Sequence, residues 1–273
     1  MKRIYLFLAC IVGLALVAQA HELWPQPSAF FAQSGEVVPI EVVVGEHFQG
    51  ERSEGKKNRI VHYTHWLGST KEEITPMLTE GHYGSVPLPL AVSGTHLIAL
   101  ANTAKYLEMR ADSFLLYLQE DGLTQVIQWR KQHNQTQKRS REFYRRCVKT
   151  LIQVGPLTSQ DYTYSRNTGM PLEIIPAQNP YSLKPGSPLR FTVLFDNKPL
   201  PNALVRYWNR ASIQHSAPAD FSEQQQRSDA KGQVSFQLKS GNNMISLVQM
   251  VPYADTKQVD WQSYWGSLTF GCR

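Results

Sequence analysis

The strongest constraint on the fold is a series of short apolar runs, each closed by glycine, proline or asparagine. One of them, VVPIEVVV at residues 37–44, ends at Gly45. β-branched and aromatic residues in short runs with turn residues between them are typical of strands. The runs that we expect to be strands are residues 37–44, 59–67, 94–101, 151–154, 172–176, 189–195, 203–208, 234–238, 244–250 and 264–270.

The period of the pattern changes in the middle of the chain. Apolar residues recur at helical spacing in residues 114–118, and Asp121 and Gly122 mark the end of that helix. Residues 123–132 predict a second helix, and residues 139–149 predict a third helical stretch after a polar break. We therefore expect a helical insert at about residues 111–149.

These elements predict a mainly β protein made of two antiparallel β-sandwich domains. A length of 273 residues with 42% hydrophobic residues is enough for two cores. The first domain is expected at residues 21–158, with the helical insert at its end. A polar linker follows at residues 159–170, and the second sandwich occupies residues 171–273.

The N-terminus predicts export. Lys2 and Arg3 precede an apolar stretch at residues 4–17, and Ala18-Gln19-Ala20 has the small-x-small pattern of a signal-peptidase site. We expect residues 1–20 to be a signal peptide and the mature, periplasmic chain to begin at His21. Lipidation at Cys10 and a retained membrane anchor are weaker alternatives, because the apolar stretch is shorter than the ~20 residues of a membrane span.

The charge indicates which classes of partner to expect, and the cysteine content indicates whether a disulfide forms. The 28 basic and 22 acidic residues give a mild excess, concentrated in residues 130–149. We interpret that stretch as a solvated helix face, with no nucleic-acid partner. Loss of the signal leaves Cys147 and Cys272, which in an oxidising compartment predict one disulfide. A metal-binding or catalytic thiol is the alternative, although neither cysteine lies in such a motif.

No enzyme motif stands out in the sequence. It lacks a G-x-S-x-G elbow, an H-E-x-x-H pair, a glycine-rich phosphate loop and a cysteine nucleophile motif. Glu22 lies so close to the mature terminus that we do not nominate it as a general acid. The expectation is a protein that is not an enzyme.

The candidate functional residue is His21. As the first mature residue it offers an α-amine and an imidazole, which together chelate one transition metal such as Ni²⁺, Co²⁺, Cu²⁺ or Zn²⁺. Binding near neutral pH displaces a proton from the amine, whose reference pKa is about 8. The alternative is that His21 follows the cleavage site by chance and binds no metal.

Other histidines are candidates for completing a site with His21. His96 lies in an expected strand and is the first choice; His62, on a neighbouring strand, and His47 are weaker choices. For each of them the alternative interpretation is an ordinary half-buried or surface histidine with no ligand role. The same alternative applies to His65, His82, His133 and His215. The tryptophans offer a competing sugar-binding interpretation, although such residues more often fill a core.

Several motifs together resemble one family of exported bacterial proteins. They are HELW at residues 21–24, VGEHFQG at 44–50, GTH at 94–96, EDGL at 120–123, REFYRRC at 141–147 and PLEIIP at 171–176. The family carries a domain of unknown function and is commonly described as the periplasmic component of a cobalt/nickel ABC-type uptake system. Residues 198–205 and 228–236 are also similar to transthyretin-like modules, of the type found beside carboxypeptidases.

The resemblance implies capture of Ni²⁺ or Co²⁺ for a membrane transporter. His21, His47 and His96 stand at matching positions of the family's motifs, whereas His62 matches none. Two alternatives remain: an interaction module without a metal, and a copper-binding protein or copper-dependent oxidative enzyme that uses the same terminal histidine.

Overall fold

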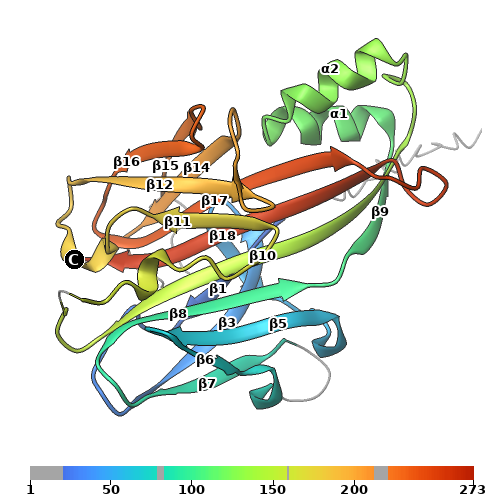
Figure 1. Cartoon of the computed structure of the whole chain (residues 1–273). Coiled ribbons are helices and arrows are strands. Elements are labelled where there is room, and N and C mark those ends of the chain that lie inside the picture. Colours follow the sequence, from blue (N-terminus) through green and yellow to red (C-terminus); the bar gives the residue numbers. More distant parts are fainter. Residues whose placement is uncertain (1–20, 79–82, 159, 212–220) are drawn as a thin grey trace, which may run out of the picture.

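The computed structural model describes residues 21–78, 83–158, 160–211 and 221–273. The predicted signal peptide lies outside these residues, as do His82 and His215. The described chain is mainly β, as predicted, with two α-helices, α1 (Ala111–Glu120) and α2 (Thr124–Gln132) (Figure 1). No described helix is both long and apolar enough to span a membrane.

The strands follow one another closely along the chain. The first half holds β1 (Glu22–Pro27), β2 (Phe31–Ala32), β3 (Glu36–Glu46), β4 (Gln49–Arg52), β5 (Ile60–Leu67), β6 (Thr70–Glu73), β7 (Ser85–Leu90), β8 (Gly94–Asn102), β9 (Lys105–Met109) and β10 (Ser140–Val154). The second half holds β11 (Leu172–Pro176), β12 (Pro188–Phe195), β13 (Lys198–Pro199), β14 (Leu204–Arg210), β15 (Phe221–Arg227), β16 (Gln233–Gln237), β17 (Gly241–Pro252) and β18 (Trp261–Cys272).

Within the described residues these strands form three sheets. The largest has ten strands in the order β15-β14-β17-β18-β10-β8-β5-β6, with β2 and β9 also paired to β10. One four-stranded sheet consists of β1, β3, β4 and β7, and another of β11, β12, β13 and β16. The two smaller sheets lie in front of and behind the large sheet in Figure 1.

The two smaller sheets cover opposite faces of the large sheet, which explains why its central strands are buried throughout. Successive side chains of a strand point to opposite faces. In β8, Leu97 packs into the core shared with β11 and β12, whereas Ile98 packs into the core shared with β3 and β7. The helices add a third core with Phe114 against Trp261 and Trp265 of β18.

β10 corrects one prediction from the sequence. Residues 139–149 were predicted to be helical, but Ser140–Val154 is a single strand of 15 residues. Its alternating Val148, Thr150 and Ile152 are β-branched and buried, as expected for a strand covered on both faces. The basic residues of this stretch had suggested a solvated helix face; Arg146 and Lys149 are instead almost fully buried.

The predicted disulfide is also wrong. Cys147 and Cys272 are both buried free thiols. Cys147 lies opposite Gly266 in the parallel pair of β10 and β18, so Cys272 is six residues further along β18. At ~3.3 Å per residue that is roughly 20 Å, whereas a disulfide needs Cα atoms within about 7 Å. Burial raises the pKa of Cys147 to about 11, so this thiol is also a poor nucleophile.

The large sheet continues across the predicted domain boundary. β10 belongs to the first predicted domain and β18 to the second, and they pair in parallel over nine positions, from Glu142 with Trp261 to Thr150 with Thr269. The division at residues 159–170 stays a prediction, but the two parts of the chain share one hydrogen-bonded sheet.

Candidate functional site

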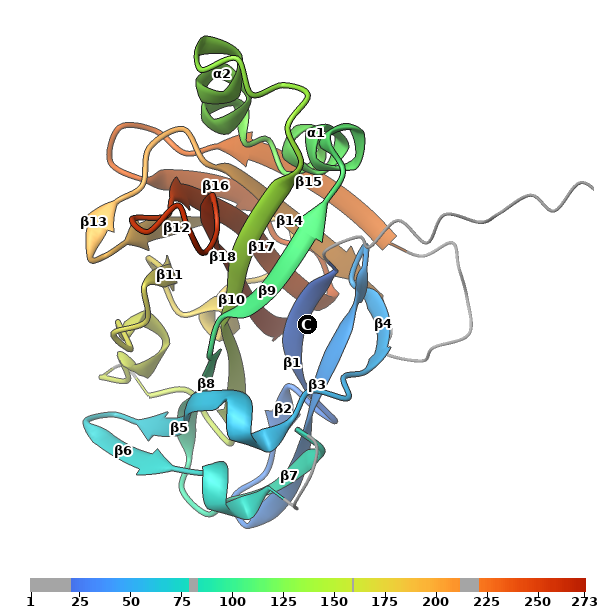
Figure 2. The same cartoon turned by 90° about the vertical axis from the view of Figure 1, so that its right-hand side faces the viewer.

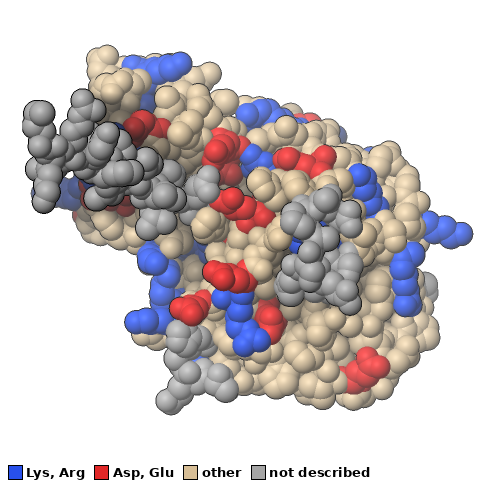
Figure 3. All heavy atoms as spheres, turned by 180° about the vertical axis from the view of Figure 1, so that it is seen from behind, with Lys and Arg blue, Asp and Glu red and all other residues tan. Residues whose placement is uncertain are grey.

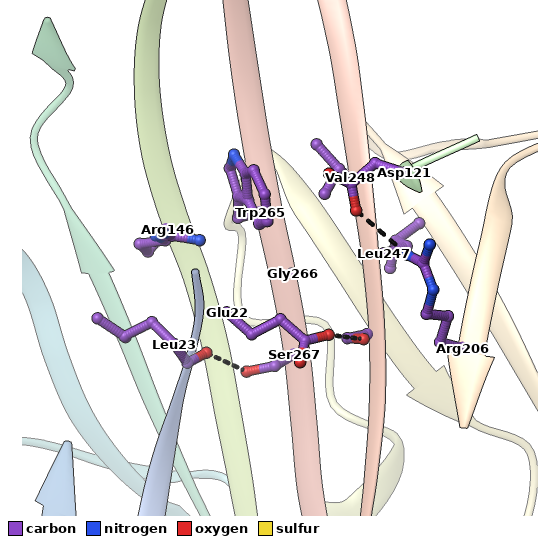
Figure 4. A pocket seen from close by; sticks show the side chains of 11 residues that line it. Glu22, Leu23, Asp121, Arg146, Arg206, Leu247, Val248, Trp265, Gly266 and Ser267 are labelled. Carbon is purple, nitrogen blue, oxygen red and sulfur yellow. Dashed lines mark hydrogen bonds and ion pairs between the residues drawn. The ribbon is translucent and has the colours of Figure 1, made fainter. Parts of the chain in front are cut away.

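The beginning of β1 is fixed in the fold although it directly follows the predicted cleavage site. The guanidinium of Arg146 donates from Nη2 to the carbonyl oxygen of His21. Further along β1, Ser267 Oγ of β18 donates to the carbonyl oxygen of Leu23 at 2.8 Å (Figure 4). Thr269 Oγ1 of the same strand donates to the carbonyl oxygen of Pro25, also at 2.8 Å. Chain termini are commonly frayed, but these contacts hold the backbone of His21 in one place.

His21 faces a carboxylate. β1 pairs with β3 so that Glu22 lies opposite Gly45, which brings His21 beside Glu46 at the end of β3. The His21 Nδ1 atom lies 3.1 Å from Oε1 of Glu46, and the two side chains are 47% and 42% exposed. Both remain accessible to an ion from solvent.

A cleft of about 390 Å³ opens beside this pair. It lies between the start of β1, the turn after β3, α1, β14, β15 and β18, and acidic side chains gather across the middle of the face seen in Figure 3. The lining residues are Glu22, Glu46, His47, Met109, Ser113, Leu116, Tyr117, Glu120, Asp121, Arg206, Trp208, Glu223 and Trp265. Five of them are acidic and one is a permanently charged base.

Glu22 is an acid of the cleft whose carboxylate is fixed by hydrogen bonds. Its Oε1 accepts hydrogen bonds from Ser246 Oγ at 2.5 Å and from Trp208 Nε1 at 3.1 Å. Its Oε2 is buried and has no hydrogen-bond partner among the described residues. Burial raises the pKa of Glu22, while the bond from Ser246 and the charge of Arg206 oppose that rise.

A second, smaller cavity of about 10 Å³ adjoins Glu22, about the space that one water occupies. Figure 4 shows Glu22 between Arg146 and Arg206, beside Trp265. Arg146 Nη1 is buried and unpartnered within the described part of the chain, and its guanidinium lies 4.5 Å from the ring centre of Trp265. The smaller cavity is therefore lined by Glu22 and Arg146, each of which has one buried polar atom without a partner among the described residues.

Arg206 organises the other side of the cleft. Its Nη1 lies 3.1 Å from Asp121 Oδ1 and its Nε 3.3 Å from Glu223 Oε1. Burial raises the pKa of Asp121 to about 7, with Arg206 opposing the rise. Asp121 follows α1, and the chain turns there through Gly122 at φ +64°, where an added Cβ would meet the Cβ of Leu204 at 2.7 Å.

The predicted histidines fall in different places. His47 lines the cleft, next in sequence to Glu46, and its ring lies 5.3 Å from that of Phe221. His62 is exposed on β5. It shares a face of the strand with Trp66, which packs into the core under β11 and β12. β1 lies over the opposite face of the sheet, so His62 is not part of the cleft.

His96 is buried and pairs with a histidine that the sequence did not single out. His65 Nε2 and His96 Nδ1 are 2.7 Å apart, and His96 Nε2 lies 2.8 Å from the carbonyl oxygen of Val92. Because a carbonyl only accepts, His96 carries its proton on Nε2 and accepts from His65. Burial lowers the pKa of His96 to about 4. His96 lies opposite Ile152, six residues along β10 from Arg146 and so roughly 20 Å from His21.

No three side chains of His, Cys, Asp or Glu within the described ranges are grouped closely enough to hold a metal ion. Any ion bound here would therefore need a donor other than a third side chain. The α-amine that the predicted cleavage before His21 would create is such a donor.

The comparison with known families gives one match, which covers most of the chain. A profile described as a domain of unknown function, DUF4198, matches residues 18–250. The chain belongs to the DUF4198 family. The matched region of this DUF4198 protein contains β1, α1 and β14, and hence most of the cleft. No curated protein matches the chain.

Sequence reasoning missed the acids and the arginines of the cleft. Glu22 was set aside as too close to a mobile terminus, but it is held by Ser246 and Trp208. Asp121 was interpreted only as the end of a helix. The signal for Glu22 was its place directly after His21, since a strand beginning there carries it into the fold; nothing local marks Arg146 or Arg206.

Proposed function

We propose that the mature protein, beginning at His21, captures Ni²⁺ or Co²⁺ in the periplasm and presents the ion to a membrane transporter. The observation that carries this proposal is the pair formed by His21 Nδ1 and Glu46 Oε1, 3.1 Å apart at the edge of an acidic cleft. The protein acts as a binding protein and performs no chemistry on the ion.

Three donors come from only two residues. His21 supplies its amine and Nδ1, and Glu46 supplies a carboxylate oxygen. Two neighbouring ligands, each ~2.1 Å from one ion, lie about 3 Å apart, and the separation between Nδ1 and Oε1 is 3.1 Å. No third side chain is grouped with this pair among the described residues, so waters would supply the remaining ligands.

The hold of Arg146 on the His21 carbonyl favours this assignment over a chance terminal histidine. A ligand whose backbone is already fixed loses less conformational entropy when it binds. The acidic lining adds a local negative potential that concentrates divalent cations. Waters would complete the coordination and leave with the ion when a transporter takes it.

The support for export of the protein and for a transporter as its partner comes from the sequence. The predicted signal peptide would carry the chain across the inner membrane and its removal would free the amine. The resemblance to a family described as part of cobalt/nickel uptake supplies the metals and the transporter. Copper remains the rival ion, because amine and imidazole nitrogens bind Cu²⁺ more tightly than Ni²⁺ or Co²⁺.

The test is native mass spectrometry and calorimetric titration of protein purified from the periplasm, with Ni²⁺, Co²⁺ and Cu²⁺ in turn. The intact mass should correspond to a chain that starts at His21, and one Ni²⁺ or Co²⁺ should bind. His21→Ala should weaken binding by at least about 100-fold, and Glu46→Gln by about tenfold, the range typical of losses at metal sites.

Two matched variants isolate the amine. One alanine added before His21 keeps the imidazole but moves the amine away, and it should weaken binding almost as much as His21→Ala. His133→Ala removes an exposed histidine of the helical segment and should change nothing. A correctly processed chain that binds none of the three ions would refute metal capture, and exclusive binding of Cu²⁺ would replace nickel and cobalt by copper.

A further inference from the structure

The hairpin turn next to Glu46 has an unusual backbone. β3 ends at Glu46 and β4 begins at Gln49, its partner across the hairpin (Figure 2). The turn therefore consists of His47 and Phe48 alone. Both have positive φ, 53° and 58°, as in a type I′ turn, where asparagine and glycine are the usual residues.

Another hairpin of the chain has the usual residue types in the same conformation. β12 and β13 are joined by Asp196 and Asn197, with φ values of 47° and 61°. Apart from the turn after β3, every described non-glycine residue with positive φ is Asn or Asp. Histidine is also tolerated there, whereas a bulky aromatic residue is an outlier. Phe48 therefore costs free energy in its backbone, which contacts of its side chain must offset.

The ring of Phe48 makes those contacts. It is buried in a small core whose other members are Trp24, Val43, Trp208 and Met244. The centre of the ring lies 5.4 Å from that of Trp24, edge to face. Trp208 and Met244 belong to β14 and β17 of the large sheet. The ring of Phe48 thus attaches the tip of the β3–β4 hairpin to the large sheet.

Two glycines bring β3 and β4 into close contact directly before this turn. Gly45 and Gly50 are paired, and a Cβ added to Gly45 would lie 2.4 Å from the Cα of Gly50. A Cβ added to Gly50 would lie 2.2 Å from the carbonyl oxygen of Val44. Any larger residue at either position would displace the backbone, so the glycines and the turn together define the path of the hairpin tip.

Glu46 depends on this tip for its position. The ladder between β1 and β3 ends with Glu22 opposite Gly45, so Glu46 lies one residue beyond the last pair. Its side chain is 42% exposed, yet its Oε1 lies 3.1 Å from His21 Nδ1. The neighbouring turn, anchored by Phe48, is what limits the movement of Glu46 relative to β1.

We infer that Phe48 is a positioning residue of the metal site, whose buried ring holds the hairpin tip so that Glu46 faces His21. This inference rests on the proposed function and adds a residue that the site needs although it does not touch the ion. A ligand that is fixed before the ion arrives loses less conformational entropy on binding. Phe48 therefore raises the affinity for the ion, and it does so only through Glu46.

The test is a double-mutant cycle, measured by calorimetric titration of Co²⁺ and Ni²⁺ into the mature full chain. Phe48→Gly removes the ring and should weaken binding several-fold, up to the roughly tenfold loss expected for Glu46→Gln. Because Phe48 acts through Glu46, the double variant should bind within about twofold of Glu46→Gln alone. The visible absorption spectrum of bound Co²⁺ is a second readout, and the Phe48→Gly spectrum should approach that of Glu46→Gln.

Matched variants separate positioning from damage to the fold. Asn197→Gly changes the turn between β12 and β13, and it should bind both ions like the wild type. Phe48→Leu keeps a buried apolar anchor and should bind within about twofold of the wild type. If Phe48→Gly does not fold, Met244→Ala, which removes packing from the ring of Phe48, takes its place in the cycle. Urea unfolding shows that each variant is folded under the titration conditions.

The outcomes distinguish this inference from the proposed function. A wild type that binds neither ion refutes both. If the wild type binds and Glu46→Gln is weakened, a Phe48→Gly variant that binds within about twofold of the wild type refutes only the positioning role. Losses from Phe48→Gly and Glu46→Gln that multiply in the double variant also refute it, because Phe48 would then act independently of Glu46.

Discussion

Carboxyl groups close to β1 are buried with only partial compensation. Glu142 accepts from Ser263 Oγ at 2.6 Å, yet its Oε2 has no partner within the described residues. Burial raises its pKa to about 7, as it does that of Asp121. Such groups hold protons in the folded state that the unfolded chain has already released, so they link stability to pH.

Glu142 should therefore make the protein less stable as pH rises. Its pKa is about 7 when folded against 4.5 as a model value, so its contribution is most favourable below 4.5 and is lost progressively up to 7. The difference is roughly 3 kcal/mol at ~1.4 kcal/mol per pKa unit. Glu142→Gln should flatten this part of the curve and gain stability, relative to the wild type, toward pH 7.

Urea unfolding at several pH values between 4.5 and 8 measures the effect. Glu108→Gln, an exposed acid, is the control and should leave the slope unchanged. A wild type and a Glu142→Gln variant whose unfolding free energies run parallel across this range would contradict the prediction.

Single residues of the site were only partly predictable. His21 followed from the cleavage pattern alone, and His47 from its motif. His96 and His62 were expected near His21, but the structure places them elsewhere. Their positions depend on strand register, which is set by long-range pairing that no local pattern reveals. The actual partner of His96 is His65, which alternation places on the other face of β5 from His62.

At the scale of elements, a buried ion pair links β10 to the sheet that covers it. Lys149 Nζ lies 2.6 Å from Glu173 Oε2, and both side chains are almost completely buried. Glu173 Oε1 accepts from Thr168 and from the backbone of Met170, so the carboxylate is fully satisfied. This ion pair joins β10 of the large sheet to β11 of the sheet above it.

Removing one partner of this pair should be severe. Glu173→Ala leaves the buried ammonium of Lys149 uncompensated, and we expect a loss of about 3–5 kcal/mol in the free energy of unfolding. The double variant Lys149→Met/Glu173→Leu removes both charges and should lose clearly less than the sum of its single variants. Urea unfolding followed by tryptophan fluorescence gives these values; a loss below about 1 kcal/mol for Glu173→Ala would contradict the prediction.

The strands whose runs are apolar and bounded by turns, such as β3 and β11, were predicted correctly, whereas strands such as β1, β7 and β15 were missed. Of β10, only residues 151–154 were predicted to be a strand, because charged residues before them such as Arg146 and Lys149 are buried but have the pattern of an exposed helix face. The alternation of Val148, Thr150 and Ile152 was the available signal, and Lys149 together with the basic residues that precede Val148 concealed it.

For the whole molecule, the consequence of the shared sheet is cooperativity. β10 and β18 lie side by side at the centre of the ten-stranded sheet, with one four-stranded sheet on each face (Figure 2). Neither the first half nor the second half of the chain contains all the strands of this sheet. That arrangement was beyond local sequence patterns, because the pairing joins strands that are far apart in the chain.

We expect the mature protein to unfold in a single transition, with equal calorimetric and van't Hoff enthalpies. A fragment of residues 21–170 lacks β18 and should not fold, because β10 would expose one edge and the face that β11 and β12 cover. Circular dichroism and calorimetry of the fragment and the full mature chain test this. Two separate transitions, or a folded fragment, would show that the halves are independent.

The place of β18 also governs when the fold can form. Its 12 residues, Trp261–Cys272, follow the other described strands in the sequence, yet they lie at the centre of the largest sheet. A chain that emerges N-terminus first from a ribosome must wait for β18 before this sheet can close. A truncation that removed only β18 would therefore abolish the fold.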